Sequence, residues 1–244
     1  MLGRLRRRLA ADPRRRAWFH RLRRPALLAA QPSTEPLSHD WGFERGTPID
    51  RYYIERFLDR HRGDVRGRVL EIKDDAYTRR YGSGVELADV LDVDAGNPRA
   101  TVVADLAAAD DLPEDAYDCF VLTQTLQLIY DVAAVARNAH RLLAPGGVLL
   151  VTVPAVSRLA GPADSYPDHW RFTGASARRL FADAFGAGNV EVRTDGNALA
   201  GAAFLLGMAA EELGSRRLGA ADPDHPVLVS IRAVKSAAAP ASAI

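Results

Sequence analysis

The sequence predicts a doubly wound α/β fold, and the pattern within residues 117–154 is the main reason. This stretch reads as an acid-led apolar strand, a helix ending in His140-Arg141-Leu142-Leu143, a turn at Pro145-Gly146-Gly147 and a second apolar strand. Both strand segments are continuous hydrophobic runs, as burial on both faces of a parallel sheet requires. The order strand, helix, strand with short connections makes a βαβ unit. We therefore expect a mostly parallel sheet with helices on both faces.

Composition is consistent with one domain plus appendages. The chain has 244 residues, of which 48% are hydrophobic, enough to bury a full core. The single cysteine, Cys119, lies in an apolar segment and has no partner for an internal disulfide, which favours a reduced, cytoplasmic setting. No apolar run reaches the ~18–20 residues that cross a bilayer, and no secretion signal is evident.

Residues 1–36 are predicted to form a basic arm and linker, in part disordered. Residues 1–24 contain ten arginines and one acid, Asp12, for a net charge of +9, so the rest of the chain carries −8. An arm of this kind is able to contact phosphate, in nucleic acid or on an anionic membrane. A solvated tail is the interpretation that we favour. The Ala-rich end, 237–244, is also expected to be disordered.

The domain, residues 37–236, is predicted to begin with a helix. Thr47 is a fair N-cap, and Pro48 suits the first helical position. Arg51 and Glu55 are expected to point outward. The buried face is expected to contain Ile49, Tyr53 and Phe57.

Apolar runs then predict seven strands, which lie in order at 68–72, 85–93, 100–104, 120–128 (including the edge of the sheet), 148–153, 190–193 and 227–234. A long loop, 154–172, follows the fifth strand. Thr173 or Ser176 is predicted to cap the next helix, which reaches Phe185. A further helix is predicted within 198–213.

The 117–154 unit closely resembles the fourth and fifth strands of the class I S-adenosylmethionine (SAM) dependent methyltransferases, of the type 11-like group. A second local match is the segment that contains Asp105-Leu106, Asp111-Leu112-Pro113 and 114–118. The resemblance extends over about residues 41–236. It implies a Rossmann-like fold with a seven-stranded sheet, SAM as cofactor and methyl transfer as activity.

The first strand departs from the family pattern. Glu71 is the acid expected before a Gly-x-Gly-x-Gly turn, in which glycine lets the backbone approach the cofactor. Here Lys73, Asp75 and Tyr77 occupy the glycine positions. A subgroup of the family has a similarly reduced turn, so the resemblance still implies SAM binding near Glu71 and Lys73. A lysine ammonium beside the positive charges of SAM is unfavourable unless its side chain turns away or engages the carboxylate.

The acid after the second strand is expected to accept hydrogen bonds from the ribose hydroxyls of the cofactor. The family places it about 20 residues after the first acid. Asp92 lies 21 positions after Glu71 and fits best, with Asp94 as the alternative. An Asp in this loop is otherwise a turn former.

Two further segments complete the expected cofactor site. The resemblance implies that Asp105 accepts from the adenine amine and that the backbone N–H of Leu106 donates to a ring nitrogen. Gln124, with Gln127 as second choice, ends the fourth strand where the family lines the methionine and methyl-donor region. A strand that simply reaches solvent would also end in polar residues.

The loop within 164–173 is the predicted source of catalytic groups. His169 is a candidate general base, oriented by Asp168 or Asp164. Tyr166, with Trp170, is a candidate wall for a ring or sugar. In the alternative, Trp170 and Phe172 only pack beneath a lid. The helix residues Arg51, Tyr52 and Tyr53 are placed to close over the pocket. No metal-binding spacing occurs.

The leading functional hypothesis is methyl transfer to a small molecule or glycan, at oxygen. The alternative is a non-catalytic scaffold or regulatory protein, which the missing glycines motivate. Lys73 or Tyr77 filling the pocket would favour that alternative, whereas an open cleft bordered by Asp92 and Asp105 argues against it. A third hypothesis is an RNA methyltransferase steered by the basic arm.

Overall fold

The computed structural model describes residues 34–108, 112–160 and 166–237. Most of the predicted basic arm and linker, nearly all of the tail, and the candidates Asp111 and Asp164 lie outside these residues. The chain divides into two units, Met1–Pro36 and Leu37–Ile244, and the sheet belongs to the second.

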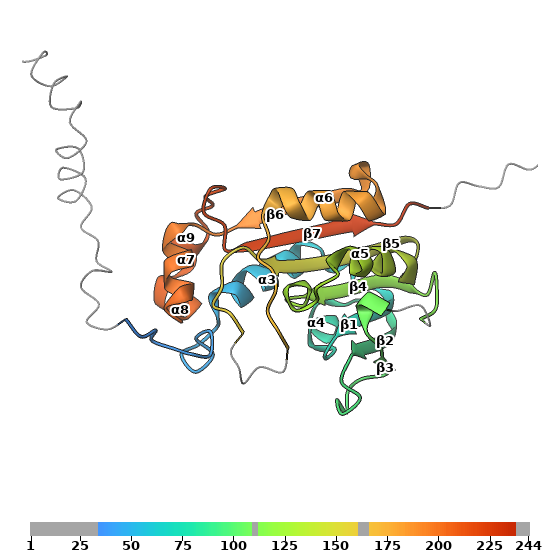
Figure 1. Cartoon of the computed structure of the whole chain (residues 1–244), viewed down its shortest axis with the longest axis horizontal. Coiled ribbons are helices and arrows are strands. Elements are labelled where there is room, and N and C mark those ends of the chain that lie inside the picture. Colours follow the sequence, from blue (N-terminus) through green and yellow to red (C-terminus); the bar gives the residue numbers. More distant parts are fainter. Residues whose placement is uncertain (1–33, 109–111, 161–165, 238–244) are drawn as a thin grey trace, which may run out of the picture. The chain divides into compact units, whose positions relative to one another are not determined.

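In the described residues seven strands form one sheet, in the order β3-β2-β1-β4-β5-β7-β6 (Figure 1). Their bounds are β1 Gly67–Ile72, β2 Val85–Asp92, β3 Val102–Val103, β4 Tyr117–Thr123, β5 Leu143–Pro154, β6 Val190–Asp195 and β7 Leu228–Val234. Neighbours from β3 to β5 are parallel, and β7 runs antiparallel to both β5 and β6. The predicted mostly parallel, seven-stranded sheet is confirmed.

Helices cover both faces of the sheet (Figure 1). One face packs against α5 (Val132–Leu142) and α6 (Gly174–Phe185), and the other against α3 (Ile49–Arg60) and α7 (Ala198–Leu205). Shorter helices are α4 Ala76–Tyr81, α8 Ala210–Leu213 and α9 Ser215–Leu218, and the 3₁₀ turns are η2 Arg62–Asp64, η3 Leu106–Ala108, η4 Leu126–Leu128 and η5 Ala187–Asn189. Among the described helices, none has the length and apolarity to span a bilayer.

Strand β4 shows why the central segment is a continuous apolar run. Cys119 and Val121 pack into the core on the α3 side, while Phe120 and Leu122 pack into the core on the α5 side. Each of these side chains is fully buried, and burial of a large apolar side chain contributes about 1.5–3 kcal/mol. Burial also raises the pKa of the Cys119 thiol, so this group stays protonated.

The start of α3 differs from the prediction. Pro48 is the N-cap residue, and no side chain caps the helix. The carboxylate of Glu211 instead engages Thr47: it accepts from the Thr47 backbone N–H at 3.0 Å and from its hydroxyl at 2.7 Å. Thr47 therefore serves a tertiary contact with α8. The prediction for the buried face of α3 is confirmed, since Ile49, Tyr53 and Phe57 are all buried.

Three other boundaries differ for local reasons. Strand β4 ends at Thr123, because Gln124 takes φ +49 and leaves the strand conformation. Strand β5 begins at Leu143, ahead of the predicted turn. The predicted helix within 198–213 is broken at Gly207, where φ is +74 and a Cβ would lie 2.6 Å from the Cβ of Ser38.

The loop after β5 ends in a capping box: of the two predicted caps, Thr173 is the N-cap residue, and Ser176 completes the box. The Thr173 hydroxyl accepts from the backbone N–H of Ser176 at 3.1 Å, and the Ser176 hydroxyl accepts from the Thr173 N–H at 3.0 Å.

We expect Thr173→Ala to lower the free energy of unfolding by about 1 kcal/mol, measured by urea denaturation. Ser83→Ala, in the exposed turn before β2, is the control and should change it by less than about 0.5 kcal/mol. Equal effects of the two substitutions would contradict a role for the cap.

Candidate active site

A cavity of about 570 Å³ opens at the carboxyl ends of β1, β2 and β4. Strands β1 and β4 are neighbours in the sheet although β2 and β3 intervene in sequence, so the strand order reverses between them. Such switch points leave a crevice in which open α/β sheets bind ligands. We call this the first cavity. Glu71, Lys73, Asp92, Asp105, Leu106 and Gln124 all line it, so the structure brings together every predicted cofactor residue.

Glu71 holds the turn that follows β1. Its side chain is buried, and its two carboxylate oxygens accept from the backbone N–H groups of Tyr77 at 3.0 Å and Thr78 at 2.7 Å, at the start of α4. Burial raises the pKa of Glu71, and these N–H groups oppose the rise. The carboxylate faces the cavity, but its hydrogen bonds show that it positions the turn.

Lys73, at the first of the missing glycine positions, has a backbone conformation that favours glycine. Its φ is +73, in the left-handed region, which costs a residue with a Cβ roughly 1–2 kcal/mol. The conformation is fixed from both sides: the Lys73 N–H donates to the carbonyl of Leu91 at 3.0 Å, and its carbonyl accepts from Nδ2 of Asn97 at 2.8 Å. The turn therefore survives without its glycine.

Asp92 is the buried acid at the end of β2. One carboxylate oxygen accepts from Nδ2 of Asn97 at 2.7 Å and the other from the backbone N–H of Asp94 at 3.1 Å. A carboxylate offers about four acceptor positions, so capacity remains for two hydroxyl groups. Asp94 is exposed, is not in the cavity wall, and accepts from the Gly96 N–H, as a turn former does. The geometry favours Asp92 over Asp94.

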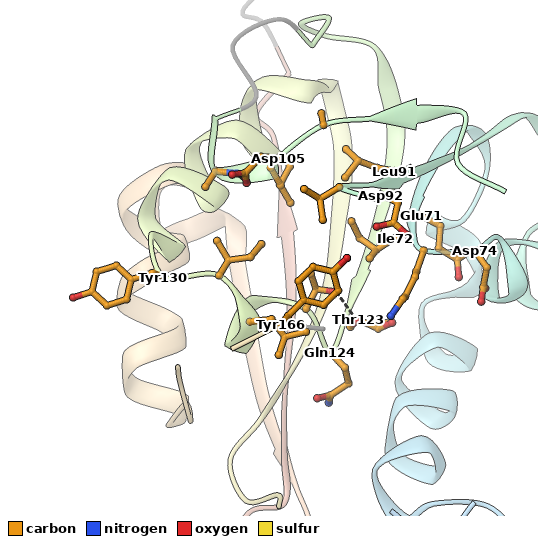
Figure 2. A pocket seen from close by; sticks show the side chains of 18 of the residues that line it. Glu71, Ile72, Asp74, Leu91, Asp92, Asp105, Thr123, Gln124, Tyr130 and Tyr166 are labelled. Carbon is orange, nitrogen blue, oxygen red and sulfur yellow. Dashed lines mark hydrogen bonds between the residues drawn. The ribbon is translucent and has the colours of Figure 1, made fainter. Parts of the chain in front are cut away.

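Asp105 and Leu106 also line the first cavity, and Figure 2 shows Asp105 on the other side of the view from Asp74. Asp105 is exposed, and one of its carboxylate oxygens accepts from the Ala107 N–H at 2.8 Å. Leu106 is buried, and its carbonyl accepts from Nδ2 of Asn138 on α5 at 2.9 Å. Side-chain contacts thus fix this segment beside the cavity.

Gln124 and Gln127 contain polar atoms without partners. Nε2 of Gln124 and Oε1 of Gln127 are buried, and among the described residues neither has a hydrogen-bond partner. The Gln124 N–H donates to the carbonyl of Thr152 on β5 at 2.9 Å, which anchors its backbone at φ +49. Burial of an unpaired amide atom costs about 1–3 kcal/mol of stability. A polar ligand that forms hydrogen bonds with these two atoms would remove this cost.

A second cavity, of about 390 Å³, adjoins the first. The residues that line both are Arg51, Lys73, Gln124, Leu128 and Tyr166. In Figure 2 the Tyr166 ring lies between Asp92 and Gln124, and Tyr130 lies at the outer margin. Burial and the nearby acids Asp92 and Asp94 raise the pKa of the Tyr166 hydroxyl, so it stays neutral.

The structure does not bring His169 and Asp168 together as a base and its orienting acid. The exposed His169 ring packs edge-on against Tyr130 and lines neither cavity. Asp168 lines the second cavity but forms a bidentate pair with Arg171, with N–O distances of 2.6 and 2.9 Å. It also accepts from the Ala160 N–H, so it organises the loop. Of the three predicted catalytic residues, Tyr166 alone reaches both cavities.

The rest of the loop also differs from the prediction in part. Trp170 lines neither cavity; its Nε1 donates to the carbonyls of Ile129 and Tyr130, both at 3.2 Å. Phe172 packs in the core, as the alternative interpretation held.

Helix α3 provides two residues of the cavity walls, Arg51 and Asp50. Arg51, which was expected on the outward face of the helix and also placed to close over the pocket, lines both cavities, and its guanidinium donates to the Tyr77 hydroxyl at 2.9 Å. Tyr53 packs in the core instead, where its hydroxyl donates to the carbonyl of Leu218.

Asp50 lines the second cavity. Burial raises its pKa, although the backbone N–H and the charge of Arg51 oppose the rise. The sequence signal that could have identified Asp50 is its position in the first turn of α3, directly before Arg51, which was placed at the pocket.

The sheet order and the cavity at its switch point define the class: this is the fold of the class I SAM-dependent methyltransferases. The methyltransferase domain family matches residues 41–184, more than half of the chain. The chain therefore belongs to this family, and its cofactor is SAM.

Solved structures agree on the fold. A SAM-dependent methyltransferase from Archaeoglobus fulgidus is 12% identical, with 76% of this chain and 94% of that chain covered and a TM-score of 0.50. A second structure of this class, from Listeria monocytogenes, is 10% identical, with 77% of this chain and 98% of that chain covered and a TM-score of 0.50. Comparison with curated proteins found no match.

The left-handed backbone at Lys73 can be tested by stability. We expect Lys73→Gly to raise the free energy of unfolding by about 1 kcal/mol relative to Lys73→Ala, because alanine keeps the Cβ that is strained at this φ. Urea denaturation of the two variants measures the difference. The comparison cancels the loss of the lysine side chain. A glycine variant less stable than the alanine variant would show that the turn is unstrained.

Proposed function

We propose that the protein transfers a methyl group from SAM to an oxygen atom of a small molecule or glycan bound in the second cavity. The observation that carries this proposal is the wall shared by the two cavities, at Lys73, Gln124 and Tyr166 in particular. Because the same side chains line both cavities, ligands in the two cavities lie next to each other at this border. Both volumes lie in or near the usual range for small-ligand sites, about 300–1,000 Å³.

The residues of the first cavity fit the cofactor. Asp92 is a buried acceptor for the ribose hydroxyls, and Asp105 lines the same cavity as the acceptor for the adenine amine. Lys73 and Tyr77 line the cavity but do not fill it. A cavity that Lys73 and Tyr77 leave open, and that Asp92 and Asp105 border, favours a catalytic protein over a non-catalytic scaffold.

SAM, when bound, supplies a methyl group on a positively charged sulfonium sulfur. When the methyl group is transferred, this sulfur leaves as the neutral thioether of S-adenosylhomocysteine. The protein then has to hold the acceptor in line and take its proton. Asp50 is the candidate base in the second cavity, because burial raises its pKa and brings a carboxylate closer to the proton affinity that a base needs. It takes the role first predicted for His169. The aromatic side chains of Trp41, Phe43 and Tyr166 offer apolar faces for a ring or sugar.

The remaining hypotheses from the sequence stay predictions. An RNA acceptor would need the basic arm, which lies almost wholly outside the described residues. The volume of the second cavity, about 390 Å³, supports a small acceptor instead. A basic arm over 1–36, a catalytic domain over 37–236, a tail over 237–244 and a cytoplasmic location are proposed on the sequence alone.

The cofactor role of Asp92 is tested by binding. We expect S-adenosylhomocysteine to bind Asp92→Asn at least about tenfold more weakly than the wild type, because hydrogen bonds from two hydroxyls to a buried charge are lost. Isothermal titration calorimetry measures both affinities. Asp94→Asn, two residues away, should bind within about twofold of the wild type. A larger loss in Asp94→Asn than in Asp92→Asn would reverse the assignment.

The acceptor proposal is tested by transfer of labelled methyl from SAM to pools of small hydroxylated compounds and oligosaccharides. With an acceptor in hand, Asp50→Asn should lower kcat by about 100-fold and leave S-adenosylhomocysteine affinity unchanged. The acid limb of the wild-type pH profile should lie above the ordinary pKa of an aspartate, because the base must be ionised and its pKa is raised. Asp59→Asn, on the exposed end of α3, is the control. Label transfer by Asp50→Asn at the wild-type rate would exclude Asp50 as the base.

A further inference from the structure

We propose that Arg51 and Lys73 bind the carboxylate of the methionine moiety of SAM and so replace the glycine turn that the chain lacks. The proposal rests on the proposed function, since it concerns the same cofactor in the first cavity. It assigns a role to the residues that most clearly depart from the family pattern.

The charge of the first cavity supports this assignment. Five carboxylates line it, at Glu71, Asp74, Asp92, Asp105 and Asp131, and in the described lining the cationic side chains are Arg51 and Lys73. SAM carries an ammonium and a sulfonium, which suit an acidic wall, and one carboxylate, which does not. Like charges brought together in a partly enclosed site repel one another strongly. The carboxylate therefore belongs at Arg51 and Lys73.

The geometry places both cations at the same border of the cavity. Lys73 is the first residue after β1, and its Nζ lies 5.9 Å from the centroid of the Tyr166 ring, so the side chain extends across the wall that the two cavities share. Arg51 reaches this wall from α3. An extended lysine and a planar guanidinium from two separate elements are well suited to hold one carboxylate between them.

Tyr77, at the third missing glycine position, fixes Arg51. Its hydroxyl accepts from Arg51 at 2.9 Å, and its own backbone N–H donates to Glu71. Two of the three replaced glycines thus serve one purpose: Lys73 provides a cation, and Tyr77 positions the other. Asp75, the remaining position, precedes α4 and pairs with Arg79 at 3.0 Å.

Arg51 and Lys73 also line the second cavity, so an acidic acceptor is the competing partner. That cavity also contains Arg158 and Arg171, the second of them paired with Asp168, whereas the first cavity has no cation besides Arg51 and Lys73 in its described lining. The cofactor carboxylate is therefore the partner that depends on them.

Calorimetry with two ligands tests the proposal. The probes are S-adenosylhomocysteine and its decarboxylated analogue, which keeps the ammonium and lacks only the carboxylate. The wild type should bind the analogue at least about tenfold more weakly. Lys73→Met and Arg51→Met should each bind S-adenosylhomocysteine at least about tenfold more weakly than the wild type, and should largely lose the difference between the two ligands. Circular dichroism confirms that each variant is folded.

Two further variants complete the design. Tyr77→Phe should weaken S-adenosylhomocysteine by a smaller factor and leave the analogue unaffected, as a positioning residue would. Arg79→Met removes a cation from α4, the helix that follows this turn, outside the cavity wall, and should change neither affinity. Equal binding of both ligands by the wild type, or equal loss of both in Lys73→Met and Arg51→Met, overturns the carboxylate assignment. Unchanged S-adenosylhomocysteine affinity in those variants also overturns it and points to the acceptor. A wild type that binds neither ligand refutes the proposed function itself.

Discussion

The site depends on one buried carboxylate, that of Glu71. It lies one residue before the end of β1, which is next to the central strand β4, and its two hydrogen bonds to backbone N–H groups tie the following turn to the start of α4. Removal of a partner from a buried charge costs several kcal/mol, so the turn has little freedom. The constraint places Lys73 on the cavity wall and Tyr77 against Arg51. A turn that usually relies on glycine is held here by charge-assisted hydrogen bonds.

The parts of the fold that follow from burial and from local hydrogen bonding were predictable from the sequence. The segment that became β4 had to be apolar on both faces, and Thr173 with Ser176 carries a capping pattern that needs no distant partner. The spacing of Asp92 after Glu71 also has a local cause, because two neighbouring parallel strands end at one edge of the sheet. Each of these signals is present within a short stretch of chain.

The errors concern side chains whose role depends on distant elements. Helical periodicity identified the buried face of α3, but of the residues placed to close over the pocket Arg51 lines it, while Tyr53 packs in the core. His169 has suitable chemistry, yet its backbone N–H donates to the carbonyl of Gln127 and its ring turns to Tyr130. Thr47 resembles a cap in sequence and is engaged by Glu211 from α8. Composition shows which chemistry a segment contains, whereas direction is decided by tertiary contacts.

The shared wall between the two cavities has a consequence for ligand design. Lys73, Gln124 and Tyr166 border both sides, so if the second cavity holds the acceptor, as proposed, adenosine and acceptor fragments can be joined into one compound that occupies both cavities. Tethering makes the second binding event intramolecular, at an effective concentration that a short linker places near the millimolar range. Such a bisubstrate compound would gain selectivity from the second cavity, because the adenosine half alone addresses features common to the fold.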